Sequence, residues 1–272
     1  MRRYLEESMP ALSDFKIRAV YSELTKSSNE NVNHSHIHDE CEIYVNLSGD
    51  VSFIVENKIY PVKPGDIIIS KPFEYHHCVY HSEKLHKHYC IWFDVKGNEK
   101  FLDIFFKRKA GEGNLLTIAP SDSEAFLSLC NTFTLPEKSE SRKYKNFFML
   151  IDYLSNATLG YINSDAYPDD VIFAINYINK NFSTIKTVEE ISKEANVSVN
   201  TLERHFKTTL NISPSDYLKK QRLANAAKLL SKGATVTESS EKSGFPDYSW
   251  FIALFKKHYG ITPNKYKKNI KK

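Results

Sequence analysis

Short apolar runs at the spacing of β-strands mark the N-terminal third of the chain. Three of them cover residues 43–45, 51–55 and 67–69, and segments rich in Gly, Pro, Asp and Asn separate them. Strands that recur about every ten residues with such turns are typical of an antiparallel sandwich or barrel. Residues 41–93 are therefore predicted to form an antiparallel β-sandwich or β-barrel.

Residues 99–160 change to a helical period. Apolar side chains recur there three or four positions apart, beginning at Phe101, Phe126 and Phe147. This spacing places them on one face of a helix. The predicted fold class is thus α+β. Residues 163–168 read as a linker, and a second, all-helical region follows it.

A motif in this second region occurs twice, with an offset of 49 residues. An internal repeat indicates that one structural unit is used twice. The matched positions are Leu202 and Phe251, Phe206 and Phe255, Lys207 and Lys256, Pro214 and Pro263, and Tyr217 and Tyr266.

Each copy is predicted to contain a helix, a tight turn and a second helix. In the first copy, Thr187 and Glu190 have the spacing of a capping box, and Ser198 is placed to cap the second helix. In the second copy, Gly244 lies in the turn and Asp247 is the cap. This is the pattern of a helix-turn-helix unit, whose second helix enters the major groove of double-stranded DNA.

In each second helix, the residues that point into the core show which residues lie on the opposite, outer face. We expect Leu202 and Phe206, and then Phe251 and Phe255, to point inward. Arg204 points outward and suits a guanine edge or a phosphate; the alternative is a surface salt bridge. The predicted DNA-contacting residues are Asn200, Thr201, Arg204 and His205 in the first unit, and Tyr248, Ser249, Ile252, Ala253 and Lys256 in the second.

Positive charge is concentrated in the region of the repeat. The whole chain has a net charge of +4. Residues 168–272 hold 18 Lys and Arg against 10 Asp and Glu, a net of +8, so residues 1–167 hold the remaining 19 basic and 23 acidic residues, a net of −4. Lys-rich surfaces are often only solvated, but this concentration favours a nucleic-acid partner.

The last hundred residues resemble the DNA-binding domain of AraC-type transcription regulators. The resemblance is carried by the two repeat copies, by residues 222–230 as a joining helix, and by Gly244, Phe245 and Asp247. It implies two units that enter successive major-groove segments on one face of DNA. It also implies a homodimer, with residues 144–159 as the interface, and an activator that contacts RNA polymerase.

The sequence departs from that family pattern at three positions. Ser239 stands where an apolar core residue is usual, Ala253 where Arg is frequent, and Glu203 places an acid on the first reading helix. We therefore expect the first unit to read bases through Arg204, and the second to rely on apolar contact and on phosphates.

Histidines gather in the other half of the chain, where eight of ten lie between His34 and His88. His36, His38 and Glu42 resemble the first motif of cupins, and His76 falls in a segment like the second. Three imidazoles and a carboxylate are suitable ligands for a divalent metal. Sensor domains in the resembled family often keep such residues without metal, so the prediction is no metal and no cofactor. The predicted effector-binding residues are His36, His38, Glu42, Tyr44 and His76, with a sugar as a candidate ligand.

Other features narrow the function. The sequence has no apolar run of about 18 residues and no apolar leader, so no membrane segment is predicted. The four cysteines lack paired spacing, which favours a reducing, cytoplasmic setting. Nucleophile-elbow, P-loop and dinucleotide fingerprints are missing from the sequence, so an enzyme is not predicted.

Together these features predict a cytoplasmic, ligand-responsive transcription regulator. Residues 1–163 are expected to form the cupin-like effector and dimerisation domain, and residues 164–272 the DNA-binding domain. Its expected partners are double-stranded DNA, a small-molecule effector, RNA polymerase and a second copy. Two alternatives remain open: a metal-dependent cupin enzyme fused to a DNA-binding domain, and a DNA binder that responds to no ligand.

Overall fold

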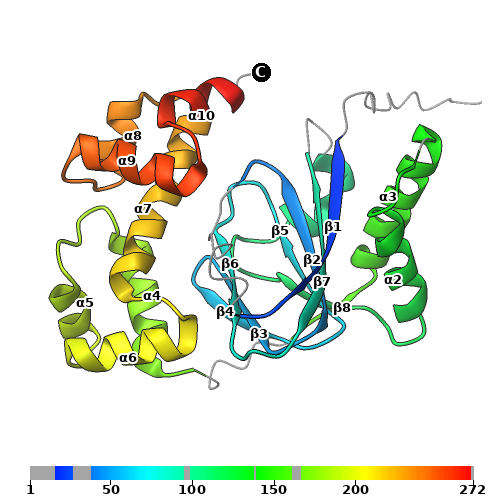
Figure 1. Cartoon of the computed structure of the whole chain (residues 1–272), viewed down its shortest axis with the longest axis horizontal. Helices are drawn as coiled ribbons and strands as arrows, with labels where there is room; N and C mark the ends of the chain where they lie inside the picture. The colour runs from blue at the N-terminus through cyan, green and yellow to red at the C-terminus, as the bar shows by residue number, and fades with distance from the viewer. Residues whose placement is uncertain (1–15, 27–37, 95–98, 138, 161–166, 271–272) are drawn as a thin grey trace, which may run out of the picture.

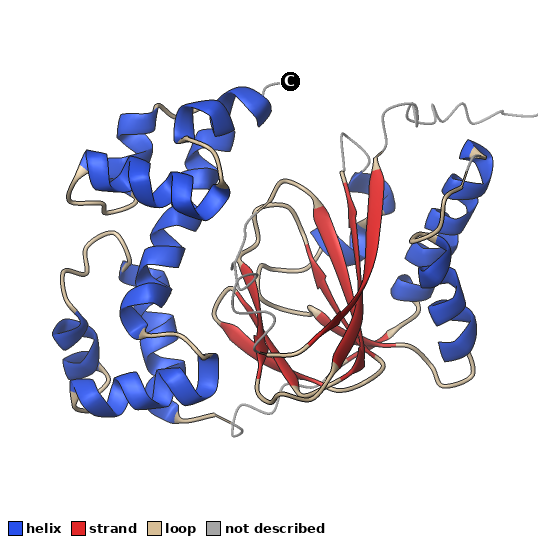
Figure 2. Cartoon of the chain, viewed as in Figure 1, coloured by secondary structure: helices blue, strands red, loops and turns tan. Residues whose placement is uncertain are grey.

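The structure, a computed structural model, describes residues 16–26, 38–94, 99–137, 139–160 and 167–270. A strand-rich part and a helical part lie side by side (Figures 1 and 2). The strands are β1 (Ile17–Leu24), β2 (Cys41–Ser48), β3 (Val51–Val55), β4 (Lys58–Val62), β5 (Asp66–Ser70), β6 (His76–Tyr80), β7 (His86–Phe93), β8 (Leu115–Thr117) and β9 (Thr158–Leu159).

The strands form two antiparallel sheets. The larger sheet has the order β1-β7-β2-β5-β8-β9, and the smaller has the order β4-β3-β6. No strand pairing joins the two sheets within the described residues. The predicted α+β class is confirmed, but the strands form two facing sheets and not one continuous closed barrel.

The side chains of β2 alternate between the two faces of the larger sheet, and both faces are buried. Ile43 and Val45 belong to a core on the outer face. Tyr44 belongs to a separate core on the inner face, which also contains Phe53 and Tyr60 of the smaller sheet. Successive side chains of a strand point to opposite faces, so one strand contributes to both cores.

Helices cover the outer face of the larger sheet (Figure 1). Their inward stripe includes Phe147, Leu150, Ile151 and Leu154 of the last helix, all of them buried. This stripe is the apolar face of residues 144–159, the predicted dimer segment, and it packs against the chain's own sheet. The helical segments here are a 3-10 helix (Glu99–Phe101), α1 (Asp103–Phe106), α2 (Ser123–Thr132) and α3 (Glu140–Ser155).

The helical part contains two units with separate cores, joined by α7. Leu202, Phe206 and Tyr217 belong to the first core, and Phe251 and Phe255 to the second. The helices are α4 (Asp169–Asn181), α5 (Val188–Glu194), α6 (Val199–Leu210), α7 (Pro214–Ser231), α8 (Val236–Lys242), α9 (Tyr248–Tyr259) and α10 (Pro263–Ile270).

Side-chain caps begin the helices as the sequence predicts, with one difference. Thr187, Ser198 and Asp247 each accept a hydrogen bond from a backbone N–H of the helix they precede. The carboxylate of Glu190 accepts from the Lys186 backbone N–H and does not close a capping box with Thr187. A full capping box forms at Thr235 instead.

The first helical unit packs against the smaller sheet. Ile54 and Tyr75 belong to the same apolar cluster as the core of that unit. The backbone carbonyl of Glu56, in the turn after β3, accepts hydrogen bonds from Asn179 Nδ2 at 3.1 Å and from the Tyr217 hydroxyl at 3.2 Å. The two parts of the chain are therefore in direct contact.

No helix among the described residues is long and apolar enough to cross a membrane.

Candidate functional site

The outer face of α6 carries an exposed cation, Arg204. Leu202 and Phe206 are buried, whereas Asn200, Arg204 and Lys207 are exposed. Among the described residues, the Arg204 guanidinium takes part in no ion pair, so the salt bridge considered for it is not formed there. Its charge is therefore available to a ligand outside the chain.

His205 and Thr201 are partly exposed on α6, and each also has a partner within the first unit. His205 Nδ1 lies 2.8 Å from a carboxylate oxygen of Asp170 in α4, so the ring is held against a neighbouring helix. The Thr201 hydroxyl is 2.8 Å from that of Ser198 at the start of α6. Both side chains are thus engaged within the first unit, unlike Arg204.

The outer face of α9 is mainly neutral. Tyr248, Ser249, Ala253 and Lys256 are exposed. Ile252 is half-buried and packs against the core of the second unit, so it is less available than its position in the repeat suggests.

Trp250 is an exposed aromatic on α9 that the sequence analysis did not select. Its side chain is 37% exposed and meets Phe245 edge-on. The repeat could have identified Trp250, because it aligns with Thr201, a predicted DNA-contacting residue. Its contact with Phe245 in the preceding turn could not be predicted from the repeat.

Ser239 is fully buried in the second unit. Its hydroxyl donates to the carbonyl of Thr235, the residue that caps the start of α8, at 2.8 Å. The polar group is therefore satisfied, and the cost of Ser at this position is limited to the missing apolar contact.

A carboxylate lies at the centre of the histidine cluster in the sensor. Glu42 Oε2 is 2.9 Å from His38 Nε2, 3.0 Å from His76 Nε2 and 2.8 Å from the indole N–H of Trp92, which donates to it. Glu42 and His76 are buried, and His38 is partly buried. Three of the five predicted effector residues thus meet, and Trp92 joins them from β7.

Tyr44, another predicted effector residue, is not in this cluster. Tyr44 lies on β2 beyond Glu42, where its ring stacks on that of His88 with centroids 4.8 Å apart and contacts Phe53. It is part of the core between the sheets. His36 lies outside the described residues.

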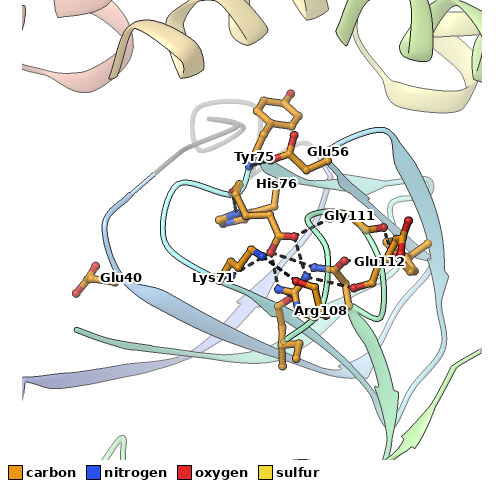
Figure 3. A network of polar contacts seen from close by, with 12 residues as sticks. Glu40, Glu56, Lys71, Tyr75, His76, Arg108, Gly111 and Glu112 are labelled. Atoms are coloured by element: carbon orange, nitrogen blue, oxygen red, sulfur yellow. Dashed lines mark hydrogen bonds and ion pairs between the residues drawn. The ribbon is translucent and has the colours of Figure 1, made fainter. Parts of the chain in front are cut away.

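Each histidine ring of the cluster is fixed by its second nitrogen. His38 Nδ1 lies 2.9 Å from the backbone carbonyl of Glu40, and His76 Nδ1 lies 2.9 Å from that of Glu74. The Glu74 carboxylate accepts hydrogen bonds from both terminal guanidinium nitrogens of Arg108 and from the backbone N–H of Gly111 (Figure 3 labels Arg108 and Gly111). The backbone around His76 is therefore anchored by a buried ion pair.

Opposing effects set the ionisation of Glu74. Burial raises its pKa, but hydrogen bonds and charge from Arg108 outweigh burial, so the pKa is lower than usual. The buried Glu74 carboxylate is therefore ionised, and the Arg108 guanidinium is the positive charge that stabilises it.

The pH dependence of sensor stability is predicted from His88. Burial lowers the pKa of His88 to about 4, despite the nearby charge of Glu42, against about 6.5 for an unfolded histidine. The unfolded chain therefore takes up the proton first, so stability is complete above pH 6.5 and falls as the pH drops toward 4. The expected loss between pH 7 and pH 5 is about 2 kcal/mol.

Urea unfolding at pH 7 and pH 5 measures this effect. His88→Phe keeps an aromatic ring against Tyr44 and removes the titrating group, so its pH dependence should be smaller by that amount. His258→Phe in the helical part is the control. An unchanged pH dependence in His88→Phe contradicts the assignment.

A separate hollow of about 630 Å³ lies between β1 and α3. Its lining includes Arg18, Glu40 and Lys143. Arg18 there pairs with Glu40 at 2.6 Å and stacks over the ring of Trp92. Sequence analysis missed this hollow because its walls are far apart along the chain.

Two domain families match this chain. Residues 25–97 match the AraC-like ligand binding domain, and residues 191–269 match a helix-turn-helix domain. The first match includes the histidine cluster, and the second includes both reading helices. These are domains of transcription regulators and not of enzymes.

Individual relatives are also regulators. The lactose operon transcription activator of Staphylococcus xylosus is 31% identical over 107 residues, which are 39% of this chain and 38% of that protein. The HTH-type regulator YobQ of Bacillus subtilis is 22% identical over 238 residues, covering 87% of this chain and 90% of its own length. A solved structure, the C-terminal domain of AraT, a response regulator from Geobacillus stearothermophilus, is 35% identical with a TM-score of 0.37 and covers 38% of this chain and 88% of that one.

Proposed function

We propose that this chain, which belongs to the AraC-type transcription regulators through its AraC-like ligand binding domain and its helix-turn-helix domain, binds specific double-stranded DNA in response to a small molecule. The single observation that carries the proposal is the pair of similar units, each with a capped second helix whose outer face is exposed. Matches to the first relatives cover under two fifths of their length, so the activity of the whole protein is argued from its own residues.

The two units divide the work of DNA recognition. Arg204 supplies a base-reading cation in the first unit, with Asn200 beside it. Tyr248 and Ser249 in the second unit offer polar and aromatic contacts, while Lys256 faces phosphates. Thr201, His205, Ile252 and Ala253 complete the proposed surface, the first three mainly as supports, since each is engaged within its own unit.

The effector acts on the sensor, which we place at residues 1–163, with the reader at 164–272. We assign His38, Glu42 and His76 as the polar centre of the effector site, with Tyr44 farther along β2, and His36 stays a candidate from the sequence alone. Tyr75, next to His76, meets the ring of Tyr217 in α7 edge-on at 6.0 Å (Figure 3 shows Tyr75 and His76). A ligand that moves His76 therefore acts directly on the joining helix of the reader.

A homodimer is proposed, with a different face from that expected. Phe148 and Met149 on α3 and Phe101 beside them are exposed large apolar residues. Phe101 meets Phe148 edge-on at 6.0 Å, which makes a small continuous patch. A dimer through this patch would present two readers to paired half-sites. Contact with RNA polymerase and a cytoplasmic location complete the proposal, since the target is DNA.

Selection from random DNA tests the function. The full chain is incubated with a pool of random duplexes, and bound sequences are recovered over several rounds. We expect enrichment of a motif with two segments one helical turn apart. Recovery of no motif, with binding that depends only on salt, contradicts sequence-specific regulation.

A further inference from the structure

The first turn of α9 exposes two aromatic side chains. Tyr248 is 48% exposed and Trp250 is 37% exposed, whereas α6, which is described throughout, exposes no large apolar side chain. In a helix-turn-helix unit, the residues at the start of the second helix are those that contact base edges. The two units therefore present different chemistry at the same place.

Trp250 lies on the same stripe of its helix as Arg204 does in the first unit. Trp250 and Ala253 are three positions apart and both are exposed, so they are neighbours on one outer face. The offset of 49 residues places them at Thr201 and Arg204 of the first unit. Trp250 therefore lies on the base-reading side of α9.

The two stripes differ in which position carries the large group. In the first unit, the small Thr201 lies beside the long Arg204. In the second, the large Trp250 lies beside Ala253, whose methyl group leaves room for a base edge to approach the indole. The group that reaches outward has thus moved by three positions and changed from a cation to an aromatic ring.

The Trp250 ring is held by its own unit. It meets the ring of Phe245, in the turn before α9, edge-on with centroids 5.6 Å apart. The Trp250 backbone N–H donates to the Asp247 carboxylate that caps the helix. A ring that is already held loses little freedom when it contacts DNA, so more of its contact energy remains for binding.

An indole is complementary to one base edge of the major groove. Thymine presents a C5 methyl group beside a single acceptor, O4. The indole has an apolar ring and one N–H donor, and it has no acceptor. Guanine instead presents two acceptors, which suit the guanidinium of Arg204.

We propose that Trp250 determines specificity by reading thymine, with its ring against the C5 methyl group and its N–H directed at O4. This inference rests on the proposed function and names the base that the second unit recognises. The operator accordingly has two unlike segments about one helical turn apart. Guanine faces Arg204 in one segment, and thymine faces Trp250 in the other.

Uracil substitution in the DNA tests the contact directly. Uracil pairs as thymine does and keeps O4, but it lacks the methyl group. The motif recovered from random DNA is synthesised with each thymine replaced singly, and fluorescence anisotropy gives the affinity of the full chain. We expect about a fourfold loss at one thymine of the second segment, and no loss for uracil outside the two segments.

Variants show whether Trp250 makes this contact. Trp250→Ala is expected to bind the thymine duplex about tenfold more weakly and to bind the thymine and uracil duplexes equally. Trp250→Phe keeps a ring without the N–H, so it should bind more weakly and still prefer thymine. Phe173→Ala, which removes an exposed ring of α4, is the matched control and should keep the full preference. A purely structural role would weaken both duplexes alike.

The outcomes separate this inference from the proposed function. Circular dichroism establishes that each variant is folded, and the uracil series on the unaltered chain needs no substitution in the protein. A motif that is indifferent to uracil overturns thymine reading and leaves the regulator. A thymine preference that survives in folded Trp250→Ala overturns the role of Trp250 alone. Recovery of no motif contradicts the regulator and this inference together.

Discussion

Arg204→Ala is expected to weaken binding to the selected DNA motif by about 1–3 kcal/mol, or about 5- to 150-fold. The guanidinium lies exposed on the outer face of α6, without an ion pair to any described residue. Its removal therefore breaks no ion pair among the described residues, and we expect it to affect mainly the DNA complex. Fluorescence anisotropy with the motif duplex and with a scrambled duplex measures both affinities.

Matched variants distinguish base reading from general charge. Lys256→Ala should weaken binding to the motif duplex and to the scrambled duplex equally, because a phosphate contact does not depend on the base sequence. Arg142→Ala, an exposed arginine of α3, should change neither. Ser249→Ala probes the second unit better than Ile252→Ala, since Ile252 also packs against a core. An equal loss on both duplexes for Arg204→Ala contradicts its assignment as a base reader.

Arg108→Met is expected to lower the unfolding free energy of the protein by about 3–5 kcal/mol. The Glu74 side chain is fully buried. Arg108 Nη1 donates to Glu74 Oε1 at 2.7 Å and Arg108 Nη2 donates to Glu74 Oε2 at 2.5 Å (Figure 3 labels Arg108). Methionine fills part of the space but leaves the carboxylate without its cation. Urea unfolding at pH 7, followed by circular dichroism, gives the free energy.

The control is a surface pair of the same chemistry. Arg142 pairs with Glu137 at 3.4 Å and is 69% exposed, so Arg142→Met should cost less than about 1 kcal/mol. Glu74→Gln combined with Arg108→Met should recover part of the lost stability, because no unpaired charge remains. A loss in Arg108→Met as small as in Arg142→Met contradicts the role given to the buried pair.

Much of the reader could be predicted because its signals are local. A cap such as Ser198 bonds a backbone N–H three residues on, and the inward residues Leu202 and Phe206 are one helical turn apart. The repeat and the family resemblance rest on the same short spacings. The two-domain α+β class and the helix-turn-helix units were confirmed for this reason.

Distant contacts changed the roles of individual side chains. His205 was predicted from its place on α6 alone, and no sequence pattern indicated that Asp170, 35 positions earlier, contacts its ring. Periodicity marked the stripe of α3 correctly as apolar. It could not show that the larger sheet covers that stripe, and the exposed residues Phe148 and Met149 lie beside it.

The sequence by itself determined the elements, their inward faces and the family, because helix periods, strand alternation and caps depend on neighbours within a few residues. Tertiary structure alone decided that His76 meets Glu42 across 34 positions and that Tyr75 meets Tyr217 across the domain contact. It also decided the direction of each ring nitrogen, which depends on the backbone carbonyl beside it.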